Sequence, residues 1–138
     1  MKHLKKFENF SFNFDYLPGN LQYRQIIIDR LQELDDRGFH IIGSVYNSDH
    51  LQVDIMKIEG KQRYGIGKCV EFNTNDVKDD LISLISELKE QGVEAEVLHF
   101  NLPSDITMSY RNSASESIES HLQKLSVDTK NVKLIFKI

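Results

Sequence analysis

Five histidines and one cysteine are the residues best suited to metal binding or nucleophilic chemistry, and they are scattered along the chain. Zinc sites in proteins usually draw two ligands from a short, regular spacing, which makes the site easy to organise. His50 and Asp54 come closest to such a pair, because residues four apart in a strand share a face. Two ligands make only half of a site. We therefore expect no metal centre and no cofactor unless another segment completes this pair.

Nucleophilic catalysis needs a serine or cysteine that is activated by a neighbouring base. The chain has no G-x-S-x-G motif, and Cys69 follows Lys68 on a predicted strand, where adjacent side chains point to opposite faces. Ser113 and Glu116 have the spacing of a capping box, which predicts a helix that begins near residue 114. These observations favour a protein without catalytic activity. An enzyme acting on a small metabolite would require a pocket that gathers His50, Asp54 and Cys69.

A glycine-rich, basic segment at residues 60–68 has some features of a phosphate-binding loop. Such a loop carries a lysine and a serine or threonine just before a helix, but Ile66 follows Gly65 here and the segment lies in a predicted strand. We therefore expect a twisted hairpin instead. Its basic side chains, with one tyrosine among them, are suited to holding the phosphates of a nucleic acid. These residues are Lys57, Lys61, Arg63, Tyr64 and Lys68.

The charge distribution predicts two opposed electrostatic surfaces. The chain of 138 residues carries 17 basic and 21 acidic residues, for a net charge of −4, whereas proteins that coat DNA are usually basic. Residues 57–68 contain four basic residues against one acidic residue, and residues 76–96 contain seven acidic residues against two basic ones. The acidic segment falls on a predicted helix, which makes the helix a plausible contact surface for a partner.

The hydrophobic pattern predicts an α+β fold in a single domain that spans residues 1–138. Two-residue alternation indicates strands, and apolar residues three and four apart indicate three amphipathic helices. The element order is β-α-β-β-β-α-β-α-β, which favours a mixed, largely antiparallel sheet with three helices packed on it. In the strand at 93–100, we expect His99 to share a face with Val93, Ala95 and Val97. The predicted strands are 8–16, 39–46, 51–58, 64–72, 93–100 and 132–138, and the predicted helices are 21–37, 77–91 and 114–125.

Part of this order, α-β-β-β-α-β over about residues 20–100, resembles the core of the restriction-endonuclease-like family, which includes Holliday-junction resolvases. The resemblance implies Mg²⁺-dependent hydrolysis by an aspartate on the second strand and a D/E-x-K motif on the third. Asp54 and Lys68 stand at the aspartate and lysine positions, but Ile66 replaces the carboxylate of the motif, and the first helix offers only Glu33. The resemblance therefore implies a degenerate relative without hydrolytic activity.

The sequence as a whole favours a small, acidic, cytosolic interaction protein that binds another protein, such as an inhibitor or immunity-type protein of a mobile element. The chain has one cysteine, no apolar run of about 20 residues, and no apolar signal-peptide core near its start, so we expect neither disulfides nor a membrane. The alternative is a nucleic-acid-binding domain that uses the basic hairpin. We also expect a homodimer through residues 132–138, which we place at a sheet edge guarded by Lys133 and Lys137.

Overall fold

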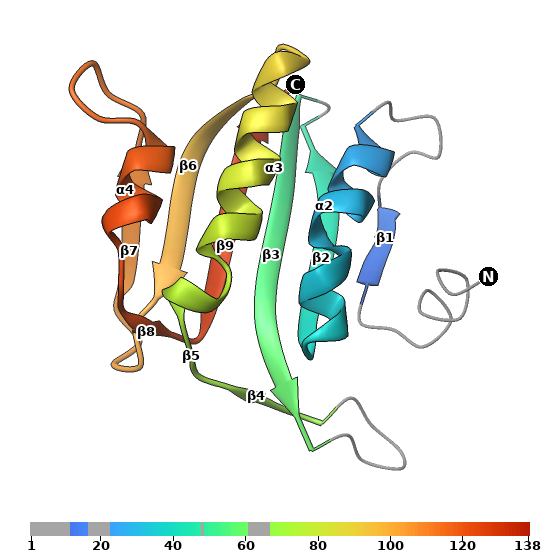
Figure 1. Cartoon of the computed structure of the whole chain (residues 1–138), viewed down its shortest axis with the longest axis vertical. Coiled ribbons are helices and arrows are strands. Elements are labelled where there is room, and N and C mark those ends of the chain that lie inside the picture. The colour runs from blue at the N-terminus through green and yellow to red at the C-terminus, as the bar shows by residue number, and fades with distance from the viewer. Residues whose placement is uncertain (1–11, 17–22, 48, 61–66) are drawn as a thin grey trace.

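The computed structural model describes residues 12–16, 23–47, 49–60 and 67–138 of the chain. Its main feature is a sheet of seven strands in the order β1-β2-β3-β9-β6-β7, with β4 paired to the far end of β3 (Figure 1). The strands of this sheet are β1 (Phe12–Tyr16), β2 (Phe39–Tyr46), β3 (His50–Glu59), β4 (Lys68–Val70), β6 (Glu94–Asn101), β7 (Thr107–Arg111) and β9 (Asn131–Lys137). The short strands β5 (Phe72–Asn73) and β8 (Asp128–Thr129) form a separate antiparallel pair.

The fold is α+β, as the hydrophobic pattern predicts. Only β1 and β2 are parallel among the described strand pairs, and the sheet is otherwise antiparallel. The helices are α2 (Arg24–Asp36), α3 (Lys78–Glu90) and α4 (Ile118–Lys124), and the 3-10 turn η1 (Thr74–Asp76) precedes α3. All three helices of the described ranges lie on the same face of the sheet (Figure 1).

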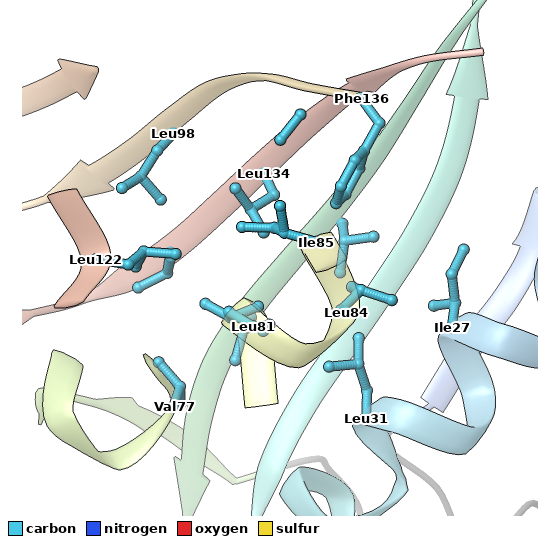
Figure 2. Packing of buried hydrophobic residues seen from close by; sticks show 14 of the residues in the cluster. Ile27, Leu31, Val77, Leu81, Leu84, Ile85, Leu98, Leu122, Leu134 and Phe136 are labelled. Carbon is cyan, nitrogen blue, oxygen red and sulfur yellow. The ribbon is translucent and has the colours of Figure 1, made fainter. Parts of the chain in front are cut away.

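One hydrophobic core fills the space between these helices and the sheet (Figure 2). Each helix contributes an apolar stripe with the predicted spacing, and the strands contribute every second residue. The stripe of α3 is the longest, with Leu81, Leu84, Ile85 and Leu88 all buried. Other members are Ile27, Leu31, Leu34, Ile41, Val53, Ile55, Leu98, Phe100, Ile118, Leu122, Val132, Leu134 and Phe136.

The opposite face of the sheet carries no described helix, and we call it the open face (Figure 1). Its side chains alternate with those of the core along each strand, and most of them are partly exposed. They include hydrogen-bonding, charged and apolar groups. The open face includes His40, Ile42, Ser44, His50, Gln52, Asp54, Met56, Val97, His99, Asn101, Thr107, Ser109, Arg111, Asn131, Lys133, Ile135 and Lys137.

The terminal strand β9 lies in the interior of the sheet, so the prediction that it forms an edge is wrong. It pairs with β3 on one side and with β6 on the other, both antiparallel. Its alternation arises because one row of side chains enters the core and the other, which includes Lys133 and Lys137, lies on the open face. Both sides of β9 are already paired, so this strand offers no free edge through which a homodimer could form.

The side chains of β6 depart from simple alternation. The pairing of β6 with β9 shifts register between Ala95 and Val97, which is the mark of a β-bulge with Glu96 as the extra residue. After the bulge, Leu98 and Phe100 enter the core, whereas His99 lies on the open face. The prediction that His99 shares the face of Ala95 is therefore wrong, because a bulge moves every following side chain to the other face.

Two other segments differ from the predicted elements. The segment predicted as a loop after Pro103 contains β7, an edge strand whose exposed residues are polar and therefore give a weak apolar signal. The strand predicted at 64–72 is described only as the short β4 and β5, and residues 61–66 lie outside the described part of the chain. The described portion bends away from β3 to pair with β8, and a single long strand is replaced by two short ones.

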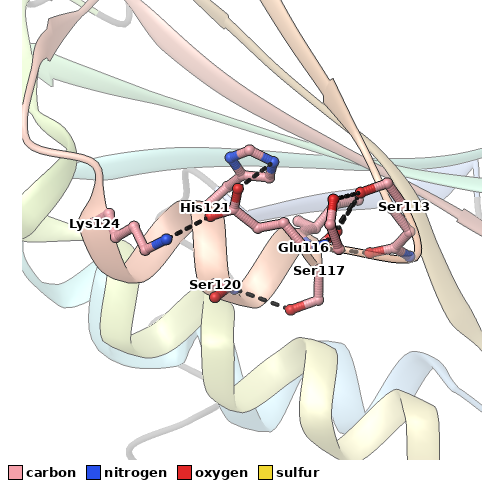
Figure 3. Close-up of polar contacts among 9 residues, drawn as sticks. Ser113, Glu116, Ser117, Ser120, His121 and Lys124 are labelled. Carbon is pink, nitrogen blue, oxygen red and sulfur yellow. Dashed lines mark hydrogen bonds and ion pairs between the residues drawn. The ribbon is translucent and has the colours of Figure 1, made fainter.

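The capping serine of α4 is Ser117, not Ser113. The Oγ atom of Ser117 accepts a hydrogen bond from the backbone N–H of Ser120 at 3.1 Å, which satisfies a free donor of the first helical turn (Figure 3). Ser113 closes the turn before the helix, where its Oγ atom accepts from the backbone N–H of Glu116 at 3.1 Å. The predicted Ser113–Glu116 pair therefore exists, but Ser113 lies four residues before the N-cap of the helix.

Candidate binding site on the open face

The described residues of the basic hairpin lie on the helix-bearing side of the sheet. Lys57 and Lys68 share a face, because Lys68 is directly opposite Glu59 and Lys57 is two residues before it. The Lys57 ammonium lies 5.5 Å from the ring centre of Phe39. The remaining predicted residues of this surface, Lys61, Arg63 and Tyr64, lie outside the described part of the chain.

Asp54 and Lys68, the two nuclease-like positions, do not come together. Lys68 is opposite Glu59, which is five residues from Asp54 along β3, or about 16 Å at the usual rise of a strand. The two side chains also project to opposite faces, since Asp54 lies on the open face. Glu33 is exposed on α2, on the other side of the sheet from Asp54. These groups therefore cannot act on one phosphate.

His50 lies at the start of β3 between two carboxylates. Its Nδ1 atom is 2.7 Å from Oδ1 of Asp49, and its Nε2 atom is 3.0 Å from Oε1 of Glu96, the bulge residue. The hydrogen bond to Asp49 is the largest influence that raises the pKa of His50, and Glu96 adds to the rise against the effect of burial. A sequence-based search could not pair His50 with Glu96, since the two are 46 residues apart.

The three residues of a possible small-metabolite site are spread along β3. His50 and Asp54 are four residues apart, about 13 Å, and Cys69 is exposed opposite Ile58 near the other end. The thiol of Cys69 lies 3.7 Å from the sulfur of Met56. Within the described ranges, no three histidine, cysteine or acidic side chains are grouped so that they could hold a metal ion.

The acidic surface of α3 is partly neutralised by α2. Arg30 pairs with Glu87, and Arg37 donates to Oδ2 of Asp80 at 2.8 Å. Burial is the largest influence on Asp80 and raises the pKa of its carboxyl, although Arg37 acts in the opposite direction. These ion pairs connect the two helices, and part of the predicted acidic contact surface therefore has a structural role.

A chain of hydrogen bonds crosses four strands of the open face. Thr107 Oγ1 donates to Oδ1 of Asn101 at 2.6 Å, Asn101 Nδ2 donates to Oδ1 of Asn131 at 2.6 Å, and Asn131 Nδ2 donates to Oδ1 of Asp54 at 3.0 Å. Every donor in this polar chain is directed toward Asp54. A fully connected network of this kind holds its members in fixed positions. The sequence places these asparagines on strands but does not show that they meet.

The adjacent row of the open face carries a cluster of four residues, His99, Ser109, Arg111 and Lys133, which we call the basic patch. The register places His99 directly between Lys133 on β9 and Ser109 on β7. Nδ1 of His99 lies 2.6 Å from Oγ of Ser109. Arg111 is two residues beyond Ser109 on the same face. Sequence analysis missed this cluster, because its residues come from three strands and the register that joins them is not visible in the sequence.

The cations of the basic patch differ from others in the structure. Arg30, Arg37, Lys124 and Lys130 each pair with a carboxylate of the protein. In contrast, neither basic residue of the patch has a carboxylate within 4.0 Å in the described ranges. Asp54 is opposite Lys133, but the described hydrogen bond of its carboxylate is to the amide of Asn131. Within the described ranges, no ion pair therefore neutralises the two cations of the basic patch.

The contact between His99 and Ser109 does not have the features of a catalytic pair. In a catalytic pair, a carboxylate usually orients the histidine and stabilises its protonated form. Here burial, and then the charges of Lys133 and Arg111, lower the pKa of His99 and make it a weaker base. A neutral imidazole beside a hydroxyl and two cations is better suited to hydrogen-bonding an anion than to removing a proton.

A pocket of about 200 Å³ lies on the helix-bearing side, between the end of α3, the start of β6 and the turn before α4. Pockets that enclose small molecules usually measure about 300–1,000 Å³. None of His50, Asp54 and Cys69 lines this pocket. Its lining residues are Ile85, Lys89, Glu94, Ala95, Asn112, Ser113, Ser117 and Glu119.

Helix α4, where it meets β7, supplies polar contacts that are structural. Glu116 accepts from Lys124 at 2.8 Å and lies 3.7 Å from Nε2 of His121 (Figure 3). The hydrogen bond from Lys124 is the largest influence that lowers the pKa of Glu116. The His121 ring stacks on Tyr110 of β7 with ring centres 4.2 Å apart. These contacts hold α4 against the strand that carries Ser109 and Arg111.

In the part of the chain that the structure describes, no helix is both long enough and apolar enough to cross a membrane. Comparison of the chain with family models, with curated proteins and with solved structures finds no match.

Proposed function

We propose that this chain is a noncatalytic protein-binding module whose partner lies against the open face of the sheet. The observation that carries the proposal is the placement of all three described helices on one face, which leaves partly exposed apolar residues, and cations without an ion pair in the described ranges, on the other. The cytosolic location and the inhibitor or immunity-type role expected from the sequence belong to this proposal.

The size and composition of the open face support a protein partner. Six strands about 4.8 Å apart, each of five to ten residues, span a surface of about 600–800 Å². A typical protein interface buries about 800 Å² on each side and combines an apolar centre with polar groups around it. Ile135 lies near the centre, between Gln52 and Val97, with Lys133 of the basic patch in the next row and Asn131 of the polar chain in the row beyond it.

Nucleic acid is a less suitable partner for this face. Asp54 lies beside Lys133, and the chain has a net charge of −4, so the continuous line of phosphates in a nucleic acid meets repulsion as well as attraction. The described cations of the hairpin, Lys57 and Lys68, lie on the other side of the sheet. Binding to nucleic acid is therefore the competing outcome of the experiment below.

The experiment uses the whole chain, immobilised and exposed to extract of its native cells, with captured proteins identified by mass spectrometry. Ile135→Arg places a bulky charge at the centre of the open face, and Ser86→Arg places the same charge on the exposed side of α3. Both positions are accessible, and thermal denaturation checks that both variants fold. A captured protein that binds wild type and Ser86→Arg but not Ile135→Arg supports the proposal.

The opposite pattern, in which Ser86→Arg loses the captured protein and Ile135→Arg keeps it, would place the interface on the helices and refute the proposal. If nuclease treatment of the extract abolishes capture, the partner is a nucleic acid. That result would favour the nucleic-acid-binding alternative.

A further inference from the structure

We propose that the basic patch, His99, Ser109, Arg111 and Lys133, binds a carboxylate side chain in an acidic segment of a partner protein. This inference rests on the proposed function, because it names the chemistry that the partner presents to the open face.

The four residues are close enough to surround one small anion. Residues directly opposite in an antiparallel sheet have Cβ atoms about 4.5–5.5 Å apart, and this relation holds for Lys133 with His99 and for His99 with Ser109. Ser109 and Arg111 are two residues apart on one strand, about 7 Å. The influence of Lys133 and Arg111 on the pKa of His99 also indicates that their charges lie near the imidazole.

The patch contains several hydrogen-bond donors on neighbouring positions of the open face. If the hydroxyl of Ser109 donates to Nδ1 of His99, the neutral imidazole carries its proton on Nε2 and offers it as a donor. Arg111 and Lys133 add charged donors that have no carboxylate of their own in the described ranges. Hydrogen bonds from cations to a carboxylate are about twice as strong as those between neutral groups.

The surroundings of the patch limit the ligand to a single compact anion. Asp54 lies next to Lys133 across the sheet, where its hydrogen bond to Asn131 holds the carboxylate in place. A phosphodiester chain that continued from the patch toward β3 would approach this carboxylate. Val97 is only 4% exposed although it lies on the open face, and the long side chains of Arg111 and Ile135 flank it. An acidic residue followed by an apolar one fits this arrangement of charge and apolar surface.

The acidic charge on the helix-bearing side of the protein also favours binding of an acidic segment to the open face. Asp79 and Glu90 are exposed on α3, and these groups repel an acidic segment from the helices. The basic patch attracts the same segment to the open face. Such opposed surfaces direct an approaching partner and increase the rate of association.

The experiment measures binding of a fluorescein-labelled peptide of alternating glutamate and valine to the whole chain by fluorescence anisotropy at low salt. The double variant Arg111→Gln/Lys133→Gln should weaken binding at least tenfold. The control Lys89→Gln/Lys124→Gln removes the same charge from two exposed residues outside the patch and should change binding less than threefold. In the wild type, nuclear magnetic resonance should show that the peptide raises the pKa of His99, because a bound carboxylate stabilises the imidazolium.

Equal weakening in the two double variants would show that the peptide responds only to net charge, and would overturn the inference. An unchanged pKa of His99 at saturating peptide would also overturn the inference. Tighter binding of a labelled oligothymidine, with the same dependence on Arg111 and Lys133, would assign the patch to nucleic acid. If these tests fail but Ile135→Arg still abolishes capture of a protein partner, the patch inference is wrong and the proposed function stands.

Discussion

Leu84 lies on the buried side of α3 and is 0% exposed, so its replacement by alanine tests the packing of the helices on the sheet. The side chain belongs to the core that α2, α3 and the central strands share (Figure 2). Replacement by alanine removes apolar atoms and leaves a cavity that the surrounding residues fill only in part.

Such substitutions in protein cores reduce the free energy of unfolding by about 2–5 kcal/mol. Leu84 is enclosed on all sides, so we expect a value near the middle of this range, about 3 kcal/mol. For a chain of this length, each kcal/mol lowers the melting temperature by about 3–5 °C. The expected decrease is therefore about 9–15 °C.

Equilibrium unfolding in urea, followed by circular dichroism, measures the free energy directly. Ser86→Ala is the matched control, because Ser86 is exposed on the same helix and its replacement should change stability by no more than about 0.5 kcal/mol. If Leu84→Ala also unfolds within about 0.5 kcal/mol of the wild type, the enclosed position of Leu84 is refuted.

Three further predictions concern the sheet. Leu134→Pro should unfold the whole protein, because β9 has neighbours on both sides and proline removes a backbone donor from its interior; a folded variant in circular dichroism would contradict this. Asp49 and Glu96 raise the pKa of His50, so this histidine stabilises the fold below its ordinary pKa of about 6.5, and the gain is lost as pH rises through the higher folded value. His50→Gln should therefore destabilise the protein more at about pH 5.5 than at about pH 8, and an equal loss at both would exclude the ion pairs as the cause. With Mg²⁺ we expect no cleavage of duplex or branched DNA, because Lys68, the lysine of the incomplete D/E-x-K motif, lies far from Asp54 and on the other face of the sheet. Cleavage that Asp54→Ala abolishes would disprove this.

The helices could be predicted from the sequence because their stability depends on a local pattern. Apolar residues three and four apart identify the buried side of a helix without knowledge of what covers it. The stripe from Leu81 to Leu88 is therefore correct in both spacing and orientation. The start of α4 is less accurate, because Ser113 and Ser117 both precede residues that they can cap, and only the backbone conformation distinguishes them.

The strands could be located from the sequence, but their side chains and neighbours could not always be assigned. The apolar alternation of β6 shifts by one residue between Val97 and Leu98 in the sequence, and the bulge at Glu96 accounts for this shift because it reverses the faces of the residues that follow. The local pattern contains this shift, but only the pairing of β6 with β9 shows that Glu96 is the extra residue. The alternation of β9 is likewise the same for an edge strand and for an interior one.

The amino-acid sequence by itself determined the α+β class, the amphipathic helices and the residues that alternate between core and solvent. Only the tertiary structure decided that β9 lies between β3 and β6, and this strand order creates the candidate site. His99, Ser109 and Lys133 come from three strands and meet because hydrogen-bonded strands lie about 4.8 Å apart, whatever their separation in the chain. A local pattern records which side chains are polar, and the register between distant strands determines which of them become neighbours.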